Sequence, residues 1–182
     1  MFKMTWSEEA SKNAKKSAAK CRGGNSPKNE LHVDEKTFGE NIFQANYPSS
    51  WTDVIEAWSS TAVGFMYGIG ATDSSKNISP YTQIIWHSTH EIGCAVAYCP
   101  QNGLPFFYVC QYQPRGNIEN EMAKPYKEGS PCEDCPDHCE DKLCDNPCKY
   151  KDTSSCKVLL ALMKDCKNKL VDQECRATCR CT

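Results

Sequence analysis

The 182-residue sequence has no long run of apolar residues. Its longest apolar stretches, residues 63–71 and 158–163, are far shorter than the roughly 18 residues that a membrane-spanning helix needs, so we expect no membrane span. The sequence also lacks the excess of positive charge that is typical of nucleic-acid-binding domains, since 21 Lys and Arg residues are balanced by 23 Asp and Glu residues. Nucleic acid is therefore not an expected partner.

Familiar enzyme motifs are also absent. The sequence contains neither the Gly-x-Ser-x-Gly nucleophile motif nor the His-Glu-x-x-His zinc motif. The glycine-containing stretch at residues 64–70 lacks the Lys-Ser/Thr pair of a phosphate-binding loop. We therefore predict a protein without catalytic residues and without a cofactor, which is not an enzyme.

Cysteine is abundant and unevenly distributed. Ten of the 14 cysteines lie within residues 132–181, a density that is typical of a disulfide framework formed in an oxidising compartment. Cys132-x-x-Cys135 resembles half of a zinc knuckle, but no second pair with ligand spacing follows it. We expect a secreted, extracellular, disulfide-bonded protein. Because residues 1–6 do not resemble a signal peptide, we expect a mature or truncated form.

Four segments carry helical patterns. A capping box from Thr5 to Glu8 precedes apolar residues at helical spacing, and a second box begins at Ser50 with apolar residues that continue to Phe65. Ser79 followed by proline indicates a third helix start. The apolar run within residues 157–164 predicts a fourth, short helix.

Two strands are predicted next to one another in the middle of the chain. Alternating apolar residues over 92–98 and the aromatic-rich segment 106–112 flank Asn102-Gly103, a pair typical of a hairpin turn. Cys94 and Cys110 are equally far from Asn102, so they face each other across the two strands and a bridge between them is plausible.

Two further cysteines, Cys21 and Cys99, are then left as partners in the first 131 residues. The remaining ten cysteines lie in a tail that divides by charge: residues 132–147 hold six acidic and one basic residue, and residues 148–182 hold four acidic and eight basic residues. The residues alone leave the pairing within this tail open.

Several segments together resemble the CAP superfamily. Residues 81–86 (Tyr-Thr-Gln-Ile-Ile-Trp), residues 107–118 and residues 39–42 (Gly-Glu-Asn-Ile) look like its signatures, and the tail is similar to the hinge and ion-channel-regulatory module of the cysteine-rich secretory proteins. The resemblance implies an α+β fold, a CAP α-β-α sandwich whose first helix is missing, then a disulfide-rich hinge and a helical, ShK-like module. The implied boundaries are 1–128, 129–147 and 148–182.

The resemblance also implies a complete disulfide pairing. Two cysteines that pair with each other in the family are replaced here by Phe38 and Gln113, so no odd thiol is left. The implied bridges are Cys21–Cys99, Cys94–Cys110, Cys132–Cys139, Cys135–Cys144, Cys148–Cys181, Cys156–Cys175 and Cys166–Cys179.

The family's central cavity holds two His and two Glu residues that can bind zinc. The matching positions here are Asn25, Glu40, Thr61 and Pro80, so a single ligand is retained. We predict no metal site, and we expect Glu40 to be a buried, hydrogen-bonded carboxylate left over from this cavity.

A second group of polar residues follows Trp86. His87 and His90 are three positions apart and Glu91 comes next, so the two histidines would share a face if they lay on a helix. We expect them instead to be polar residues in a turn. Asn77-Ile78-Ser79 is a candidate N-glycosylation site, although the proline that follows disfavours its use.

The last module resembles small sea-anemone potassium-channel toxins in the order of its six cysteines. Those toxins present a Lys-Tyr pair, and the matching residues here are Lys169 and Leu170. We predict Lys169, Leu170 and an exposed Tyr150 as channel contacts. The alternative is a basic face that serves only solubility.

The functional prediction is a secreted, non-enzymatic, monomeric protein that binds a cell-surface protein such as a cation channel. The alternative is a reproductive-tract or egg-associated protein that acts on a sperm receptor through the CAP domain, in gamete binding or chemoattraction. Lipid or sterol carriage and a residual hydrolase activity are two further hypotheses.

Overall fold

The computed structural model describes residues 1–145, 150, 152–163 and 165–180. The chain divides into two compact units, residues 1–145 and residues 146–182. The predicted Cys148–Cys181 bridge lies outside the described residues.

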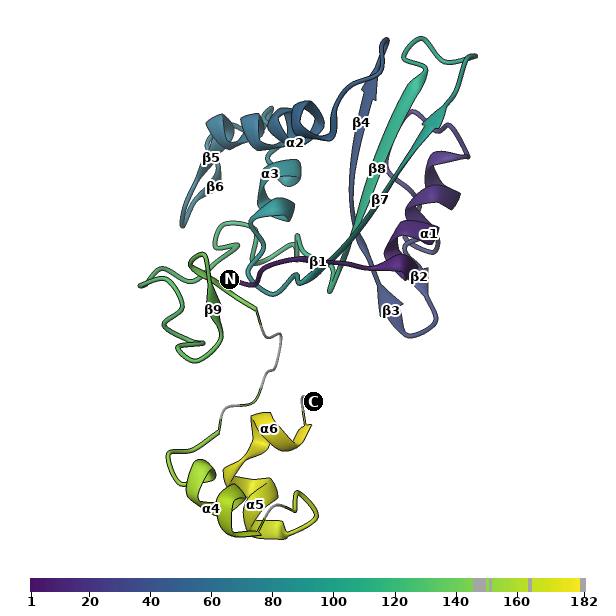
Figure 1. Cartoon of the computed structure of the whole chain (residues 1–182). Helices are drawn as coiled ribbons and strands as arrows, with labels where there is room; N and C mark the ends of the chain where they lie inside the picture. The colour runs from purple at the N-terminus through teal and green to yellow at the C-terminus, as the bar shows by residue number, and fades with distance from the viewer. Residues whose placement is uncertain (146–149, 151, 164, 181–182) are drawn as a thin grey trace. The chain divides into compact units, whose positions relative to one another are not determined.

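The first unit is built on a four-stranded sheet. The strand order is β1-β7-β8-β4, with β1 parallel to β7 and the other neighbours antiparallel (Figure 1). The strands are β1 (Thr5–Trp6), β4 (Gly39–Ala45), β7 (Glu91–Tyr98) and β8 (Phe106–Gln113). Strand β8 is almost wholly buried, because it lies in the interior of the sheet and helices cover both of its faces.

Helices cover both sides of this sheet, with α1 (Glu8–Ala18) on one side and α2 (Trp51–Ser59) and α3 (Ser79–Ile84) on the other (Figure 1). Alternate residues of β8 serve the two cores, since Phe107 and Val109 pack with the alanines of α1, and Tyr108 and Tyr112 pack with α2. The predicted α+β, α-β-α sandwich is confirmed.

Helix α1 begins later than the sequence predicts. Its N-cap is Ser7, whose side chain accepts a hydrogen bond from the backbone N–H of Ala10. Thr5 is paired with Glu91 in the sheet, so the capping box predicted from Thr5 is wrong. Parallel pairing of β1 with β7 satisfies the backbone of Thr5, and Ser7 is left as the first residue able to cap the helix.

Helix α2 begins where the sequence predicts but ends earlier than predicted. Ser50 and Asp53 form the reciprocal capping box. The helix ends at Ser59 and gives way to a 3₁₀ turn, η1 (Ser60–Gly64), so the predicted extension to Phe65 is wrong. The following residues form a short hairpin of β5 (Phe65–Met66) and β6 (Gly70–Ala71). Helix α3 begins at Ser79 with a proline in its first turn, as predicted.

The central hairpin has the predicted register and the predicted inner strand ends. Cys94 pairs with Cys110 across β7 and β8. The strands separate after Tyr98 and rejoin at Phe106, as predicted, and Asn102-Gly103 lies within the loop of residues 99–105 that joins them. Asn102 donates from its side chain to the carbonyl of Cys21 at 2.9 Å, which holds this loop against the end of α1.

The hinge cysteines belong to the first unit. Residues 139–140 (β9, Cys139–Glu140) pair with β10 (Leu143–Cys144), and two bridges, Cys132–Cys139 and Cys135–Cys144, close this segment. The Cys144 N–H donates to the Met1 carbonyl at 2.9 Å, and the Lys3 N–H donates to the Cys144 carbonyl at 2.8 Å. The start of the chain thereby anchors the hinge, while the predicted boundaries of 1–128, 129–147 and 148–182 stay a prediction.

Two more strands complete the first unit. Strands β2 (His32–Val33) and β3 (Lys36–Thr37) form a small hairpin ahead of β4. The first unit also contains the Cys21–Cys99 and Cys94–Cys110 disulfides. These bridges and the two hinge bridges are the pairs that the family resemblance implies.

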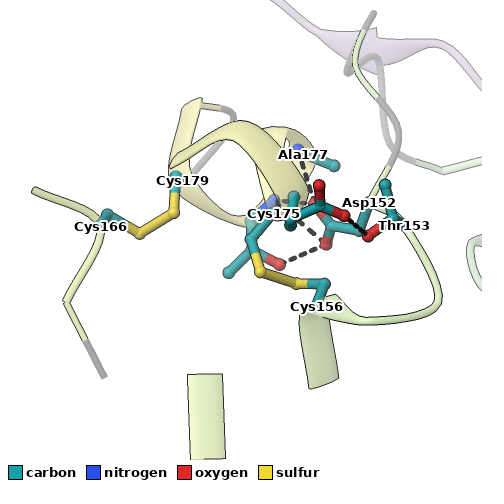
Figure 2. The surroundings of a disulfide bond; sticks show 9 residues. Asp152, Thr153, Cys156, Cys166, Cys175, Ala177 and Cys179 are labelled. Carbon is teal, nitrogen blue, oxygen red and sulfur yellow. Dashed lines mark hydrogen bonds between the residues drawn. A yellow bond between two sulfur atoms is a disulfide. The ribbon is translucent and has the colours of Figure 1, made fainter. Parts of the chain in front are cut away.

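The second unit is a small helical module. It contains α4 (Cys156–Met163), α5 (Lys169–Glu174) and α6 (Arg176–Arg180), and its disulfides join Cys156 to Cys175 and Cys166 to Cys179 (Figure 2). Its core consists of buried Cys156, Val171 and Cys175. Among the described residues, no helix combines the length and the apolarity that crossing a bilayer requires.

An aspartate anchors the start of this module to its last helix. The carboxylate of Asp152 accepts hydrogen bonds from the backbone N–H groups of Ala177 and Thr178, at 2.7 and 3.1 Å (Figure 2). Thr153 donates from its backbone to the carbonyl of Glu174 at 2.8 Å. Disulfides and these polar contacts hold a module whose apolar core is small.

Candidate functional site

The first candidate site is an open cavity of about 380 Å³ at the ends of β4 and α3. Glu40 reaches it from β4, and Asn25 lies in the loop after α1. Two positions of the family's ligand set, Asn25 and Glu40, therefore come together, while Thr61 and Pro80 are not part of the lining. Other lining residues include Lys28, Ser79, Gln83, Arg115 and Asn117.

The carboxylate of Glu40 is occupied by hydrogen bonds within the protein. Its Oε1 accepts from the Ser26 N–H at 2.8 Å. Its Oε2 accepts from the hydroxyls of Ser17 and Ser26, both at 3.0 Å, and from Gln111 Nε2 at 2.9 Å. These contacts connect α1, the following loop, β4 and β8. The carboxylate thus connects these elements. It is hydrogen-bonded, as the sequence predicts, but it is half-buried, so the prediction that it is buried is wrong.

The residues present do not fit a zinc ion. Thr61 Oγ1 donates to the carbonyl of Trp58 at 2.8 Å and accepts from the N–H of Tyr81 at 3.1 Å, so it stabilises the junction of α2 and α3. Pro80 has no ligating side-chain atom. Across the part of the chain that the structure describes, no three His, Cys, Asp or Glu side chains form a group able to hold a metal.

The cavity wall contains a residue that the sequence analysis did not single out. Gln83 is 1% exposed, and its Nε2 lacks a hydrogen-bond partner among the described residues. It is tightly packed between two glycines, since a Cβ at Gly116 would lie 2.6 Å from Gln83 Nε2 and one at Gly39 would clash with the same amide. The sequence offered one signal for this residue, since Gln83 lies within the family-like segment 81–86. Its close approach to Gly39 is a tertiary contact, which the sequence pattern does not contain.

His87 and His90 lie in the turn between α3 and β7 and not on one helix. His87 stacks on Trp86, and burial of its ring lowers its pKa below the ordinary histidine value. His90 Nδ1 lies 3.1 Å from the carbonyl of Ser88, and Glu91 is paired within the sheet. Each of the three is used locally, so they do not form a shared site.

Asn77 is exposed and its side chain is turned toward the sequon's own serine. Asn77 Oδ1 accepts from the Ser79 N–H at 3.1 Å and from the Ser79 hydroxyl at 2.7 Å. The side chain is accessible at the surface, and glycosylation here stays a prediction.

The second candidate site is the surface of the C-terminal module. Lys169 and Leu170 begin α5, where the Asn168 side chain caps the helix by accepting from the Leu170 N–H at 3.0 Å. Both side chains are exposed, Leu170 to 47%. Tyr150 is half-buried, so the prediction of an exposed side chain there is wrong. The cap stabilises the first turn of α5, on which Lys169 and Leu170 lie.

Comparisons with known proteins agree with this architecture. The family model described as "Cysteine-rich secretory protein family" matches residues 1–112, and the model named "Crisp" matches residues 132–182. The human protein "Cysteine-rich secretory protein 2" is 39% identical over all 182 residues, which span 74% of its length.

Solved structures give the same result for the fold. The crystal structure of NaASP2 with Zn²⁺ aligns with a TM-score of 0.63 at 28% identity, over 80% of this chain and 77% of that one. Hookworm Platelet Inhibitor aligns with a TM-score of 0.59 at 25% identity, over 80% of this chain and 76% of that one. From its sandwich, its cysteine-rich tail and these matches, the chain belongs to the cysteine-rich secretory protein family of the CAP superfamily.

Proposed function

We propose that this chain is a secreted, non-enzymatic protein that modulates cation channels on target cells through its C-terminal module. Membership in a family of secreted, generally non-enzymatic proteins supports the first part. The disulfide-bonded character of both units fits an oxidising extracellular environment. The observation that carries the second part is the exposed Lys169-Leu170 pair on a capped helix of a cross-linked module.

The chemistry of this pair suits a cation pathway. A lysine ammonium is a compact charge on a long stem, so it can enter the mouth of a channel that is lined by carbonyl or carboxylate oxygens. Leu170 supplies an apolar contact beside it. The Cys156–Cys175 bridge and the buried Val171 hold α5 in place, so little ordering is required when the pair binds.

The second candidate function is recognition through the first unit, in gamete binding or chemoattraction. Three large aromatic side chains of that unit are more than half exposed, Trp6 to 57%, Tyr47 to 65% and Tyr98 to 64%. Aromatic residues of this kind are enriched at protein interfaces, which favours a binding surface on the sandwich.

The test is a recording of cation currents during application of the oxidised full chain. We expect Lys169→Ala to reduce the effect on the current strongly. The matched control is Lys124→Ala, which changes an exposed lysine of the first unit and should leave the effect on the current unchanged. Unaltered modulation by Lys169→Ala contradicts the proposed contact. Loss of the effect in a Trp6→Ala/Tyr98→Ala variant alone would favour the second candidate.

A further inference from the structure

Helix α4 of the C-terminal module has two apolar faces. Cys156, Leu159 and Leu160 face inward and pack with the core around Val171 and Cys175. On the outward side, Val158 is 62% exposed and Leu162 is 76% exposed. The two are four positions apart and therefore lie one above the other on the helix surface. We call Val158, Ala161 and Leu162, all exposed, the outer face of α4.

This outer face differs from the usual solvent side of a small helix. A surface helix normally turns polar residues to water, and a helix that is apolar all round is normally buried. Lys157 is the single charged residue within α4. The core of the module uses one apolar side of α4, and the other side stays exposed to water unless a second apolar phase covers it.

The charges of the module indicate what that phase is. Lys157, Lys167, Lys169 and Arg176 are exposed, and no salt bridge neutralises them among the described residues of this unit. Nearby carboxylates are instead used inside the module. Asp152 caps α6, Asp165 accepts from the Lys167 N–H at 2.8 Å, and Glu174 accepts from the Thr153 hydroxyl. The basic side chains therefore remain available to an external anion.

We propose that the outer face of α4 binds the surface of an anionic lipid bilayer. Val158 and Leu162 enter the boundary between headgroups and acyl chains, and Lys157 on the same helix, with the other exposed basic side chains of the module, contacts the acidic headgroups. A bilayer presents both phases side by side, which is the arrangement that interfacial basic, amphipathic segments recognise. This inference does not depend on channel modulation, since it concerns lipid alone.

The test is sedimentation of the oxidised full chain with vesicles of phosphatidylcholine, with and without phosphatidylserine. We expect binding to the phosphatidylserine vesicles that weakens with added salt, and about tenfold or greater loss of that binding in Val158→Glu and Leu162→Glu. The matched control is Val63→Glu, which places the same charge at an 84% exposed valine of the first unit and should bind like the unmodified chain.

Two further variants separate lipid binding from misfolding. Leu162→Phe retains an apolar residue and should preserve vesicle binding, and Lys157→Gln should weaken it and reduce its salt dependence. Free-thiol counting verifies that the disulfides of each variant are closed. The proposal is overturned if the unmodified chain does not bind phosphatidylserine vesicles, or if Val158→Glu and Leu162→Glu bind them like Val63→Glu. If the unmodified chain does not bind vesicles but Leu162→Glu loses channel modulation, the outer face binds a protein partner instead.

Discussion

Asn13 on α1 donates a hydrogen bond to Gln111 on β8, with 2.5 Å between Asn13 Nδ2 and Gln111 Oε1. Gln111 in turn donates from Nε2 to the carboxylate of Glu40 on β4, so three elements are connected by one polar chain. Gln111 is fully buried and Asn13 is 9% exposed. In a low-dielectric interior such a chain is stabilising as long as every member keeps its partner.

The first prediction concerns the end of this chain. Glu40→Gln replaces an acceptor-only carboxylate with a group whose amide nitrogen meets the donors of Ser17, Ser26 and Gln111. We expect the free energy of unfolding in urea to fall by about 1–3 kcal/mol. Glu56→Gln, on the exposed side of α2, is the control. Equal stability of the two variants would show that the Glu40 contacts contribute nothing.

The second prediction concerns the contact between α1 and β7. A Cβ at Gly93 would lie 2.6 Å from the backbone carbon of Ala10 and even closer to the Ser11 nitrogen. Backbone atoms cannot move aside as a flexible side chain does, so Gly93→Ala should destabilise the first unit by about 3 kcal/mol or more. Gly103→Ala, where the added atom has open space, should be nearly neutral in the same thermal denaturation.

The third prediction compares two disulfides of the first unit. Cys21–Cys99 spans 78 residues of sequence and Cys94–Cys110 spans 16. Loop-closure entropy in the unfolded chain assigns about 4.5 kcal/mol to the longer loop and about 3 kcal/mol to the shorter one. Paired alanine substitutions should therefore destabilise more at Cys21 and Cys99. The reverse order in urea titrations would show that loop entropy does not decide which bridge stabilises the fold more.

The fourth prediction concerns the attachment of the hinge. Lys3→Pro removes the N–H that donates to the Cys144 carbonyl, while Lys3→Ala keeps it. We expect Lys3→Pro to cost about 1 kcal/mol and to accelerate hydrogen exchange at the Cys144 amide. Lys3→Ala controls for loss of the exposed ion pair with Glu140, which should have little effect. Unchanged exchange in Lys3→Pro would mean that the hinge is held by other contacts.

The central hairpin shows how much of the fold the residues predict. The positions of Cys94 and Cys110 about Asn102 were sufficient for the register, because side-chain alternation allows no one-residue shift without reversing the buried face. What holds the loop was not predictable from Asn102-Gly103. The contact of Asn102 with Cys21, 81 residues away, holds it, and no local pattern contains this contact.

The cap of α1 illustrates the same limit. Thr5 and Ser7 are both suitable capping residues, and local sequence favoured Thr5 because Glu8 follows at the right spacing. Pairing with β7 decided between them, and that pairing joins residues 86 positions apart. The hydrogen-bonded role of Glu40 was predicted from the loss of the other zinc ligands. Its four donors come from α1, β8 and the loop containing Ser26, and no local pattern shows that these segments meet at Glu40.

The contrast between the two candidate sites has a physical cause. The cavity residue Glu40 interacts with its own protein, whereas Lys169 and Leu170 are exposed at a capped helix start. Satisfied hydrogen bonds within the protein are typical of structural roles, and exposed charge beside exposed apolar surface is typical of recognition. This difference is the reason for placing the activity in the C-terminal module.

One measurement tests that placement most directly: cation currents recorded with the unmodified chain and with a Cys156→Ala/Cys175→Ala variant. Both cysteines lie in the buried core of the module, so their loss should disorder the module while the sandwich of the first unit keeps its circular dichroism spectrum. We predict that the variant loses channel modulation. Full modulation by the variant would contradict the account and assign the activity to the first unit.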